Sequence, residues 1–464
     1  MLKQAFGDAA FNRRVVAVAL PIIIQNAITN LVSLLDNIMV GRVGTLPMSG
    51  VSIVNNLIFV FYLCIIGGCA GAGIFVAQYH GSGDNKSICY IFRYKFLMGL
   101  LVGILGTVLF YYACDPLIGL YLKGEGDPAE AAQILEYGRE YMMMMLWGLL
   151  PYAVSSAYAS TLRECDQGVV PMVAGVVAVV VNLILNYILI FGHFGAPAMG
   201  VRGAALATVI SRYVELVIIM VWSHTHEEAV PFLRGAFRSL YIPGEMVKKV
   251  TLKGMPMLIN EALWSAGEAV IAQLYSTRGL EVVPAVNITS TIFNLSSVVV
   301  MSMGVSVGII MGQLQGAGTS TEKLWDANRK LTVMTVAAGV IFGLVLIGIS
   351  GLFPQLYNTT ESVRKLSATM ILICGIFLPL VGYVHSVYFT MRSGGKTWIT
   401  FFFDGGYSWL FIIPGAALLC YGFNAPILAV YIFCRGAAYL VKSILGYFIL
   451  RRGTWIHNLA NTDF

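Results

Sequence analysis

Five carboxylates fall within apolar stretches of this sequence, where a charged side chain is costly. A charged group at the centre of a bilayer costs at least about 2.5–3.5 kcal/mol on insertion scales. Acidic residues retained at such positions are typical of proton or cation sites, so they are the first candidates for chemistry. The five residues are Asp36, Glu215, Glu261, Glu268 and Asp404.

Polar side chains of two later apolar stretches are expected to lie at the same depth in the membrane as Asp36. At a rise of 1.5 Å per residue it lies about 30 Å from the start of its helix, and Asn186 lies about 27 Å along another. Asn182 and Asn186 are four residues apart and share a face, and Thr208 can reach the same level. Such oxygen ligands suit Na+ or a carboxyl that switches by protonation. Alternatively, Asp36 caps its helix or neutralises Arg42 at the outer face.

A second polar group lies in the later half of the chain. Glu261 and Glu268 are seven residues apart and share a helix face. Asp404 and Glu261 lie about 12 and 17 Å into their helices from the same side, so they could share a pocket and a proton. His385 either switches its charge near physiological pH or packs as a hydrogen-bonded neutral ring. With Asn260, these residues are candidates for coupling or substrate binding.

The elements that position these residues are membrane-spanning helices. The 464 residues are 58% hydrophobic and 11% charged, whereas soluble domains carry about 25% charged residues. Long apolar runs predict helices, because barrel strands would alternate over short segments. We expect twelve helices, at residues 15–40, 50–77, 95–114, 137–162, 168–191, 200–222, 250–277, 284–312, 327–353, 366–391, 396–419 and 425–448.

The distribution of lysine and arginine predicts the orientation. Most of the 29 such residues fall on one side of the expected helices, including Arg13, Lys248 and Lys442, and few fall on the other, such as Arg202. The positive-inside rule then places both termini and the linker 231–249 in the cytoplasm.

The chain repeats itself at an offset of 235 residues. Pro21 corresponds to Pro256, and Gln78 to Gln313, without a gap. The repeat predicts an all-α integral membrane fold in two pseudo-symmetric six-helix lobes, 1–230 and 250–464, around a central cavity. This layout is typical of transporters. The glycine-rich stretch that precedes Asp84 is duplicated too, so we interpret it as close helix packing rather than phosphate binding.

Two arginines within the expected helices predict ion pairs. Arg212 and Glu215 are three residues apart on one helix, and Arg435 lies near the repeat position. Because buried charges are usually paired, we expect these residues to hold each lobe together.

Several stretches, in this order and spacing, resemble the multidrug and toxic compound extrusion (MATE) family over essentially the whole chain. The resemblance implies two lobes, a V-shaped cavity and export of amphipathic, often cationic compounds against H+ or Na+. The matching stretches are LPIIIQNAITNLVSLLDNIMVGRVG, AGAGIFVAQYHGSGD, RECDQGVVPMVAGVVAVVVNLILNYILIFG, GVRGAALATVIS and GIIMGQLQGAG.

The resemblance also implies roles for individual residues of the ion site. Asp36 falls where one branch of the family has its cation-binding aspartate, and Asn182 and Thr208 match other members of that site. Asn186 departs from the pattern, because that branch usually has a second aspartate there. Glu261 is the closer match to a glutamate of other branches, whereas their aspartate of the tenth helix has no counterpart near Val381.

We therefore expect a secondary active exporter, not an enzyme, coupled to inward H+ or Na+ flux by alternating access, with no other cofactor. Its partners would be small amphipathic molecules and the lipid bilayer, not nucleic acid, and it would work as a monomer in the cytoplasmic membrane. One alternative is a flippase for lipid-linked sugars, which would need more intramembrane cations. A remote alternative is an integral-membrane transferase, for which the sequence has no DxxD-like or HxxH-like group.

Overall fold

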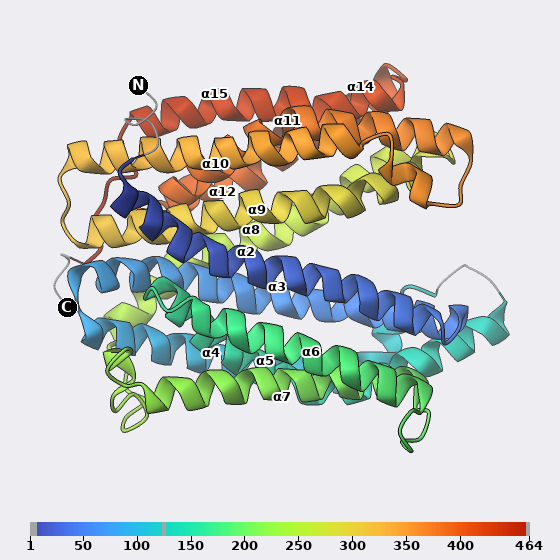
Figure 1. Cartoon of the computed structure of the whole chain (residues 1–464), viewed down its shortest axis with the longest axis horizontal. Coiled ribbons are helices and arrows are strands. Elements are labelled where there is room, and N and C mark those ends of the chain that lie inside the picture. Colours follow the sequence, from blue (N-terminus) through green and yellow to red (C-terminus); the bar gives the residue numbers. More distant parts are fainter. Residues whose placement is uncertain (1–6, 123–126, 461–464) are drawn as a thin grey trace. The chain divides into compact units, whose positions relative to one another are not determined.

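The computed structural model describes residues 7–122 and 127–460, apart from the side chains of residues 32–34 and 37. Both chain termini, whose orientation was predicted above, lie outside the described residues. Within these ranges the chain is helical and contains no strand (Figure 1). In the described residues, ten helical segments are long and apolar enough to span a membrane, and α5 and α8 are two further long helices with more charged residues.

Every expected helix is present, and the all-α membrane fold is confirmed. Ten helices are continuous: α2 (Ala9–Gly41), α3 (Thr45–Ser82), α4 (Asn85–Gly119), α5 (Pro128–Glu164), α6 (Val169–Phe191), α7 (Gly200–Thr225), α8 (Gly244–Ser276), α9 (Val282–Gly316), α10 (Thr321–Ile349) and α11 (Glu361–Ser393).

The last two segments contain π-helical turns. The first consists of α12 (Thr397–Phe401), η3 (Phe402–Gly406), η4 (Ser408–Ile412), α13 (Ile413–Ala417) and η5 (Leu418–Gly422). The second consists of α14 (Ile427–Ile432), η6 (Phe433–Ala437) and α15 (Ala438–Arg451). The described residues also contain two short 3-10 turns, η1 (Pro231–Leu233) and η2 (Phe353–Leu356).

Several helices run past the expected bounds at their polar ends. An apolar run marks only the part of a helix that lies in lipid, so the polar turns at a helix end are missed. For example, α4 begins ten residues before its expected start at residue 95. Its N-terminus is set by Asp84, whose carboxylate accepts from the backbone N–H of Ser87 at 3.1 Å. Asp127 caps α5 in the same way, with Pro128 in the first turn. Capping satisfies backbone donors that have no partner within the helix.

The chain divides into two compact units, which we describe separately. Unit 2 contains residues 24–76 and 84–250. In it α4 packs on α5, α5 on α7, and α7 on α6 (Figure 1). Fully buried apolar side chains from several of these helices form its core, including Val54, Ile65 and Met142.

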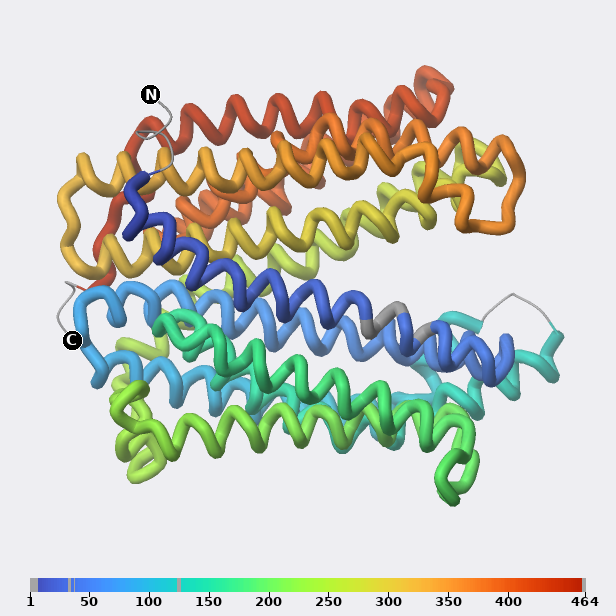
Figure 2. The backbone as a smooth tube through the Cα atoms, viewed as in Figure 1, coloured from blue at the N-terminus to red at the C-terminus, as the bar shows by residue number. Residues whose placement is uncertain are grey.

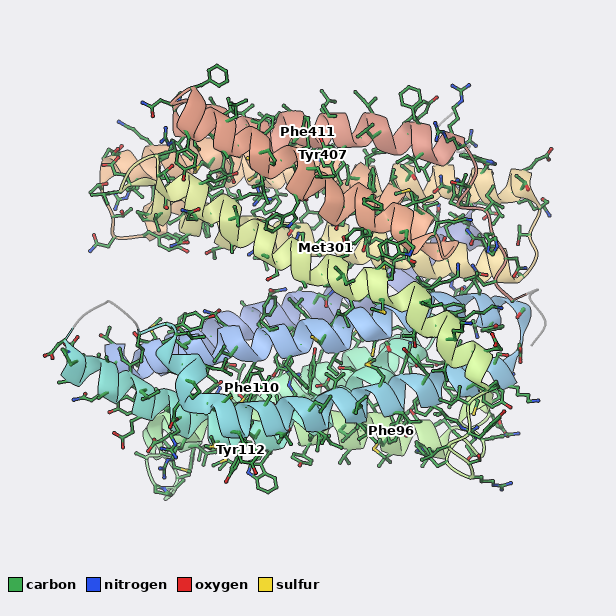
Figure 3. All side chains as sticks on the ribbon, turned by 180° about the vertical axis from the view of Figure 1, so that it is seen from behind. Phe96, Phe110, Tyr112, Met301, Tyr407 and Phe411 are labelled. Carbon is green, nitrogen blue, oxygen red and sulfur yellow. The ribbon has the colours of Figure 1, made fainter. Side chains whose placement is uncertain are left out.

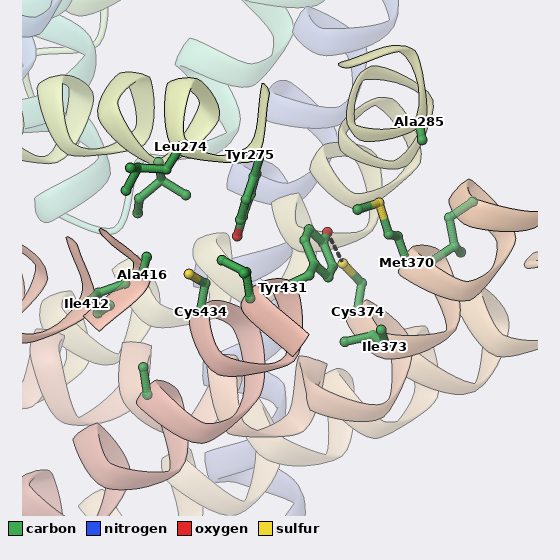
Figure 4. Packing of buried hydrophobic residues seen from close by; sticks show 14 of the residues in the cluster. Leu274, Tyr275, Ala285, Met370, Ile373, Cys374, Ile412, Ala416, Tyr431 and Cys434 are labelled. Carbon is green, nitrogen blue, oxygen red and sulfur yellow. Dashed lines mark hydrogen bonds between the residues drawn. The ribbon is translucent and has the colours of Figure 1, made fainter. Parts of the chain in front are cut away.

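Unit 1 contains residues 7–23, 77–83 and 251–460 among those described. Its helices α9, α10 and α11 pack on one another, and α15 packs on α11. Figure 4 shows part of its core, where Tyr275 and Tyr431 lie among Cys374 and Cys434. The Cys374 sulfur and the Tyr431 hydroxyl are 3.0 Å apart. The units differ from the halves of the sequence repeat, because residues 7–23 and 77–83 pack with the second half.

The duplicated glycine motif makes a reciprocal contact inside unit 1. A Cβ added at Gly81 would lie 2.0 Å from the Gln313 carbonyl oxygen, and one added at Gly316 would lie 1.8 Å from the Gln78 carbonyl oxygen. Gly81 and Gly316 are repeat partners, as are Gln78 and Gln313. No side chain larger than hydrogen fits at either glycine, which is the close packing that the sequence indicated.

Candidate functional site

Asp36, Asn182, Asn186 and Thr208 lie together in unit 2. The Asn186 amide nitrogen donates to the Asp36 carboxylate at 2.7 Å and to the Asn182 side-chain oxygen at 3.1 Å. The Asn182 nitrogen donates to the Thr208 hydroxyl at 3.3 Å. Helices α2, α6 and α7 thus contribute one connected chain of polar groups.

Local sequence explains how these groups meet. Asn182 and Asn186 are one turn apart on α6, which places both amides on the face that Asp36 contacts. Both are buried, with exposed fractions of 5% and 2%. The Thr208 hydroxyl donates to the Ala204 carbonyl at 3.1 Å, which leaves its lone pairs to accept from Asn182.

The cluster has unused acceptor capacity. The buried Asn186 side-chain oxygen has no hydrogen-bond partner in the described part of the chain. The Asn182 oxygen faces Asp36. Turning this amide by 180° would bring its nitrogen within 3.0 and 3.2 Å of the two carboxylate oxygens. With the Asn182 amide in either orientation, the cluster brings together a carboxylate, amide oxygens and a hydroxyl, groups of the kind that bind a proton or a hard cation.

The alternative role for Asp36 finds no support in this geometry. Within residues 7–122 and 127–460, no ion pair joins Asp36 to Arg42. The carboxylate instead accepts from the Asn186 amide, a neutral donor on another helix.

Asp404 has a different kind of partner in unit 1. The Lys442 ammonium lies 2.7 Å from one carboxylate oxygen. The Asn260 amide donates to the other at 3.0 Å, while its own oxygen accepts from the Gly405 N–H at 2.9 Å. Lys442 is buried, with a side-chain exposure of 4%. The sequence analysis placed Lys442 among the residues at the cytoplasmic face; it lies instead inside the helix packing, because Asp404 supplies a counter-charge.

The other residues predicted for the second half do not all join Asp404. Glu268, which was expected to share a helix face with Glu261, forms an ion pair with Arg435 at 3.1 Å. The His385 ring bonds to the Val381 carbonyl at 2.8 Å, within its own helix. Between Glu261 and Asp404 the described residues show no hydrogen bond.

Two π-helical turns carry charged members of these pairs. Asp404 lies in η3 and Arg435 in η6. Such turns are rare and are often found at functional sites, since the extra residue reorients a side chain. No pattern in the sequence indicated either π-helical turn.

The predicted pairing of intramembrane arginines is confirmed. Arg212 and Glu215 are 3.1 Å apart, and Arg435 pairs with Glu268. A pair that the sequence analysis missed joins Lys95 to Glu164 at 2.6 Å, with a further bond from Lys95 to Ser160 at 3.1 Å. Lys95 is fully buried, although its position beside a helix end indicated the membrane surface.

Comparison with known proteins identifies the family. The sequence model of the family described as MatE matches residues 21–188 and 256–418. The chain belongs to the MatE family. This membership classes it as a transporter and not as an enzyme.

Relatives support the assignment across most of the chain. The probable multidrug resistance protein NorM of Thermotoga maritima is 24% identical over 391 residues, covering 83% of this chain and 80% of its own length. The multidrug resistance protein MdtK of Yersinia pseudotuberculosis is 26% identical, covering 88% and 87%.

Solved structures share the fold. A MATE protein in complex with MaD3S superposes with a TM-score of 0.86 at 18% identity and covers 98% of each chain. The outward-facing conformation of a multidrug resistance MATE family transporter gives 0.84 at 17% identity and covers 97% of each chain.

Proposed function

We propose that this MatE-family protein is a secondary active exporter of amphipathic, often cationic compounds in a bacterial cytoplasmic membrane. Inward flux of H+ or Na+ would drive it by alternating access. The relatives named as multidrug resistance proteins support the substrate class. The membrane-spanning helices support a multi-pass protein, and the positive-inside rule favours cytoplasmic termini and a cytoplasmic linker.

The observation that carries this proposal is the set of neutral polar groups that surround the Asp36 carboxylate. Its described hydrogen-bond partner is a neutral amide, Asn186, and the side-chain amide of Asn182 also lies beside the carboxylate. A carboxylate in such a place is stabilised by binding a proton or a cation. If the ion binds one conformation more tightly than the other, it shifts the protein between inward-facing and outward-facing states. Asp36 would then hold the coupling ion, with Asn182, Asn186 and Thr208 as its neutral ligands or positioning groups.

The polar groups of unit 1 would contribute differently. Asp404 already binds the ammonium of Lys442, so it is less available to a coupling ion than Asp36. Glu261 and Asn260 remain candidates for substrate recognition, because both lie on α8 near that pair.

The alternative function, a flippase for lipid-linked sugars, agrees less well with the pairing of the intramembrane cations. A transporter of lipid-linked phosphates needs cations that are free to bind its cargo. In the described residues, Lys95, Arg212, Arg435 and Lys442 each have a carboxylate partner.

The test is efflux of a cationic dye from proteoliposomes, first under an imposed pH gradient and then under an imposed Na+ gradient. We expect Asp36→Asn to abolish gradient-driven efflux, Glu261→Gln to reduce it, and Glu361→Gln, at a side chain that is 68% exposed, to leave it unchanged. Wild-type efflux by both Asp36→Asn and Glu261→Gln would overturn this assignment of the coupling residues. Absence of efflux by the unmodified protein under either gradient, with several cationic dyes, would overturn the exporter proposal.

A further inference from the structure

A basic pocket lies outside the proposed ion site, at one end of unit 2. Its volume is about 300 Å³, and it lies between the start of α4 and the segment after α7. Lys86, Arg93 and Arg234 line it together with Tyr90 and Phe232, and no acidic side chain is among its lining residues. Three cations around one cavity repel one another, so the arrangement favours an anionic occupant.

The segment 231–241, which we call the strap, forms one wall of the pocket. The sequence analysis treated it as part of a linker, but it is folded against α4 (Figure 2). Phe232 is buried, and its ring packs on Phe92 with centroids 6.2 Å apart. Phe237 packs on Phe96 at 5.3 Å. The strap is therefore an ordered part of the unit.

Arg93 fixes the strap through its guanidinium group. It donates to the carbonyls of Ala236 at 2.7 Å, Tyr241 at 3.0 Å and Gly235 at 3.2 Å. A guanidinium carries five N–H donors, so two are left after these bonds. Arg93 is itself 8% exposed. This buried cation both shapes the pocket and retains donors for a ligand.

The other two cations lie at the rim. The Lys86 ammonium is 6.0 Å from the centroid of the Tyr90 ring, and the Arg93 guanidinium is 5.7 Å from the same ring. Arg234 is 3.6 Å from Glu227, but both side chains are about half exposed. Exposed pairs of this kind are worth little, so Arg234 can exchange Glu227 for a stronger anion.

The position of the pocket along α4 predicts that it lies at the depth of lipid headgroups. On α4, Leu101, Leu105 and Tyr112 are strongly exposed apolar residues, which suits contact with lipid. Figure 3 shows Phe96 and Tyr112 along this helix. Arg93 precedes Leu101 by eight residues, or about 12 Å of helix, so it lies just beyond the apolar stretch.

The strap also offers apolar side chains to a membrane. Phe237, Leu240 and Tyr241 are 42%, 50% and 65% exposed. They alternate with Arg234 and Arg238 along the strap. Exposed aromatic and aliphatic residues beside basic ones are typical of segments that lie at the interface of an anionic membrane.

We propose that this pocket binds the phosphate headgroup of an anionic phospholipid. Lys86, Arg93 and Arg234 contact the phosphate, and Leu240 and Tyr241 lie against the lipid's acyl chains. Free inorganic phosphate shares the headgroup's chemistry, but it would not use the apolar rim. The proposal does not depend on what the protein exports.

The test measures lipid bound to the purified full-length protein in neutral detergent by native mass spectrometry. Phosphatidylglycerol, phosphatidylcholine and inorganic phosphate are titrated in separate arms. We expect the double variant Lys86→Ala, Arg234→Ala to bind phosphatidylglycerol roughly 25-fold more weakly, since each surface charge contributes about fivefold in affinity. The matched control is Arg139→Ala, Arg202→Ala, in a second pocket of unit 2 that Glu136 and Glu140 also line; it should change binding less than twofold.

A second variant separates the two sources of phosphate. Leu240→Ser with Tyr241→Ser should weaken phosphatidylglycerol binding several-fold and leave any inorganic phosphate binding unchanged. Equal binding of phosphatidylglycerol and phosphatidylcholine, or equal losses in the pocket and control variants, would overturn the proposal. Tight binding of inorganic phosphate, with phosphatidylglycerol binding insensitive to the strap variant, would overturn the lipid assignment.

Discussion

Asp36 in unit 2 and Asp404 in unit 1 are two intramembrane carboxylates with opposite environments. Asp36 accepts from the neutral amide of Asn186 at 2.7 Å. Asp404 contacts the Lys442 ammonium at the same distance and accepts from one amide, Asn260. Among the described contacts the first carboxylate has no ion pair, so our proposal has a proton or cation from outside the protein neutralise it. The second has a permanent cation on a neighbouring helix.

This difference suggests that the two carboxylates have different roles in transport. A coupling ion must bind and leave in each transport cycle, which a lysine fixed to the chain cannot do. The Asp404–Lys442 pair therefore suits a structural or substrate-positioning role, and Asp36 suits the exchange of an ion. At the repeat offset of 235 residues, Asp36 corresponds to Ile271, a buried core residue. The repeat itself thus does not require a charge at position 36.

Replacing Asp36 is expected to have the largest effect on transport. Asp36→Asn keeps the size and the hydrogen bonds of the side chain but cannot carry a negative charge. We expect gradient-driven efflux from proteoliposomes to fall to the level of empty liposomes, while the thermal unfolding midpoint stays within a few degrees. A variant that still transports against a substrate gradient would show that Asp36 is not the residue that exchanges the ion.

Breaking the second pair should mainly reduce stability. Lys442→Met leaves the Asp404 carboxylate buried without its cation, and removing one partner of a buried pair costs about 3–5 kcal/mol. The free energy of unfolding in detergent, measured with denaturant, should fall by that amount. The double variant Asp404→Asn, Lys442→Met should recover most of the loss, because no charge is left unpaired. If Lys442→Met were as stable as the original protein and lost coupling instead, the two carboxylates would not differ as argued.

Adding a carboxylate beside Asp36 should increase the difference in cation binding between the Asp36 and Asp404 sites. Asn186→Asp would place a second negative charge beside Asp36, which favours a bound cation over a shared amide. We expect the Na+ concentration needed for half-maximal efflux to fall about tenfold, since one added charge at an effective dielectric constant near 20 is worth at least that much. The matched substitution Asn260→Asp, beside the pair that already contains Lys442, should leave the Na+ dependence unchanged. A similar fall in both variants would contradict the comparison.

The features that could be predicted from the sequence are those that depend on a single helix. All twelve helices could be predicted, because apolar length is a local property. Asn182 and Asn186 could be paired with Asp36 because depth along a helix follows from residue count. Whether these residues couple an ion stays a prediction.

Contacts between helices were harder to predict. Lys442 and Lys95 lie near the ends of the helices expected from the sequence, where a lysine usually reaches the membrane surface. Nothing local indicates that Asp404 and Glu164 will bury them. The pairing of Glu268 with Arg435 depends on how α8 packs against η6. The folding of the strap against α4 likewise depends on Arg93, whose three backbone acceptors lie more than 140 residues away along the chain.

The smallest expected effect comes from the outermost member of the Asp36 cluster. Thr208→Val keeps the shape of the side chain but removes the hydroxyl that accepts from Asn182 at 3.3 Å. The freed amide can then turn its nitrogen toward Asp36, where it competes with the ion. A neutral hydrogen bond is worth about 0.5–1.5 kcal/mol, so the ion affinity inferred from efflux should fall roughly two- to tenfold. Thr107→Val is the matched control, because the Thr107 hydroxyl bonds only to the Gly103 carbonyl of its own helix in the described contacts; equal losses in both variants would exclude Thr208 from the cluster.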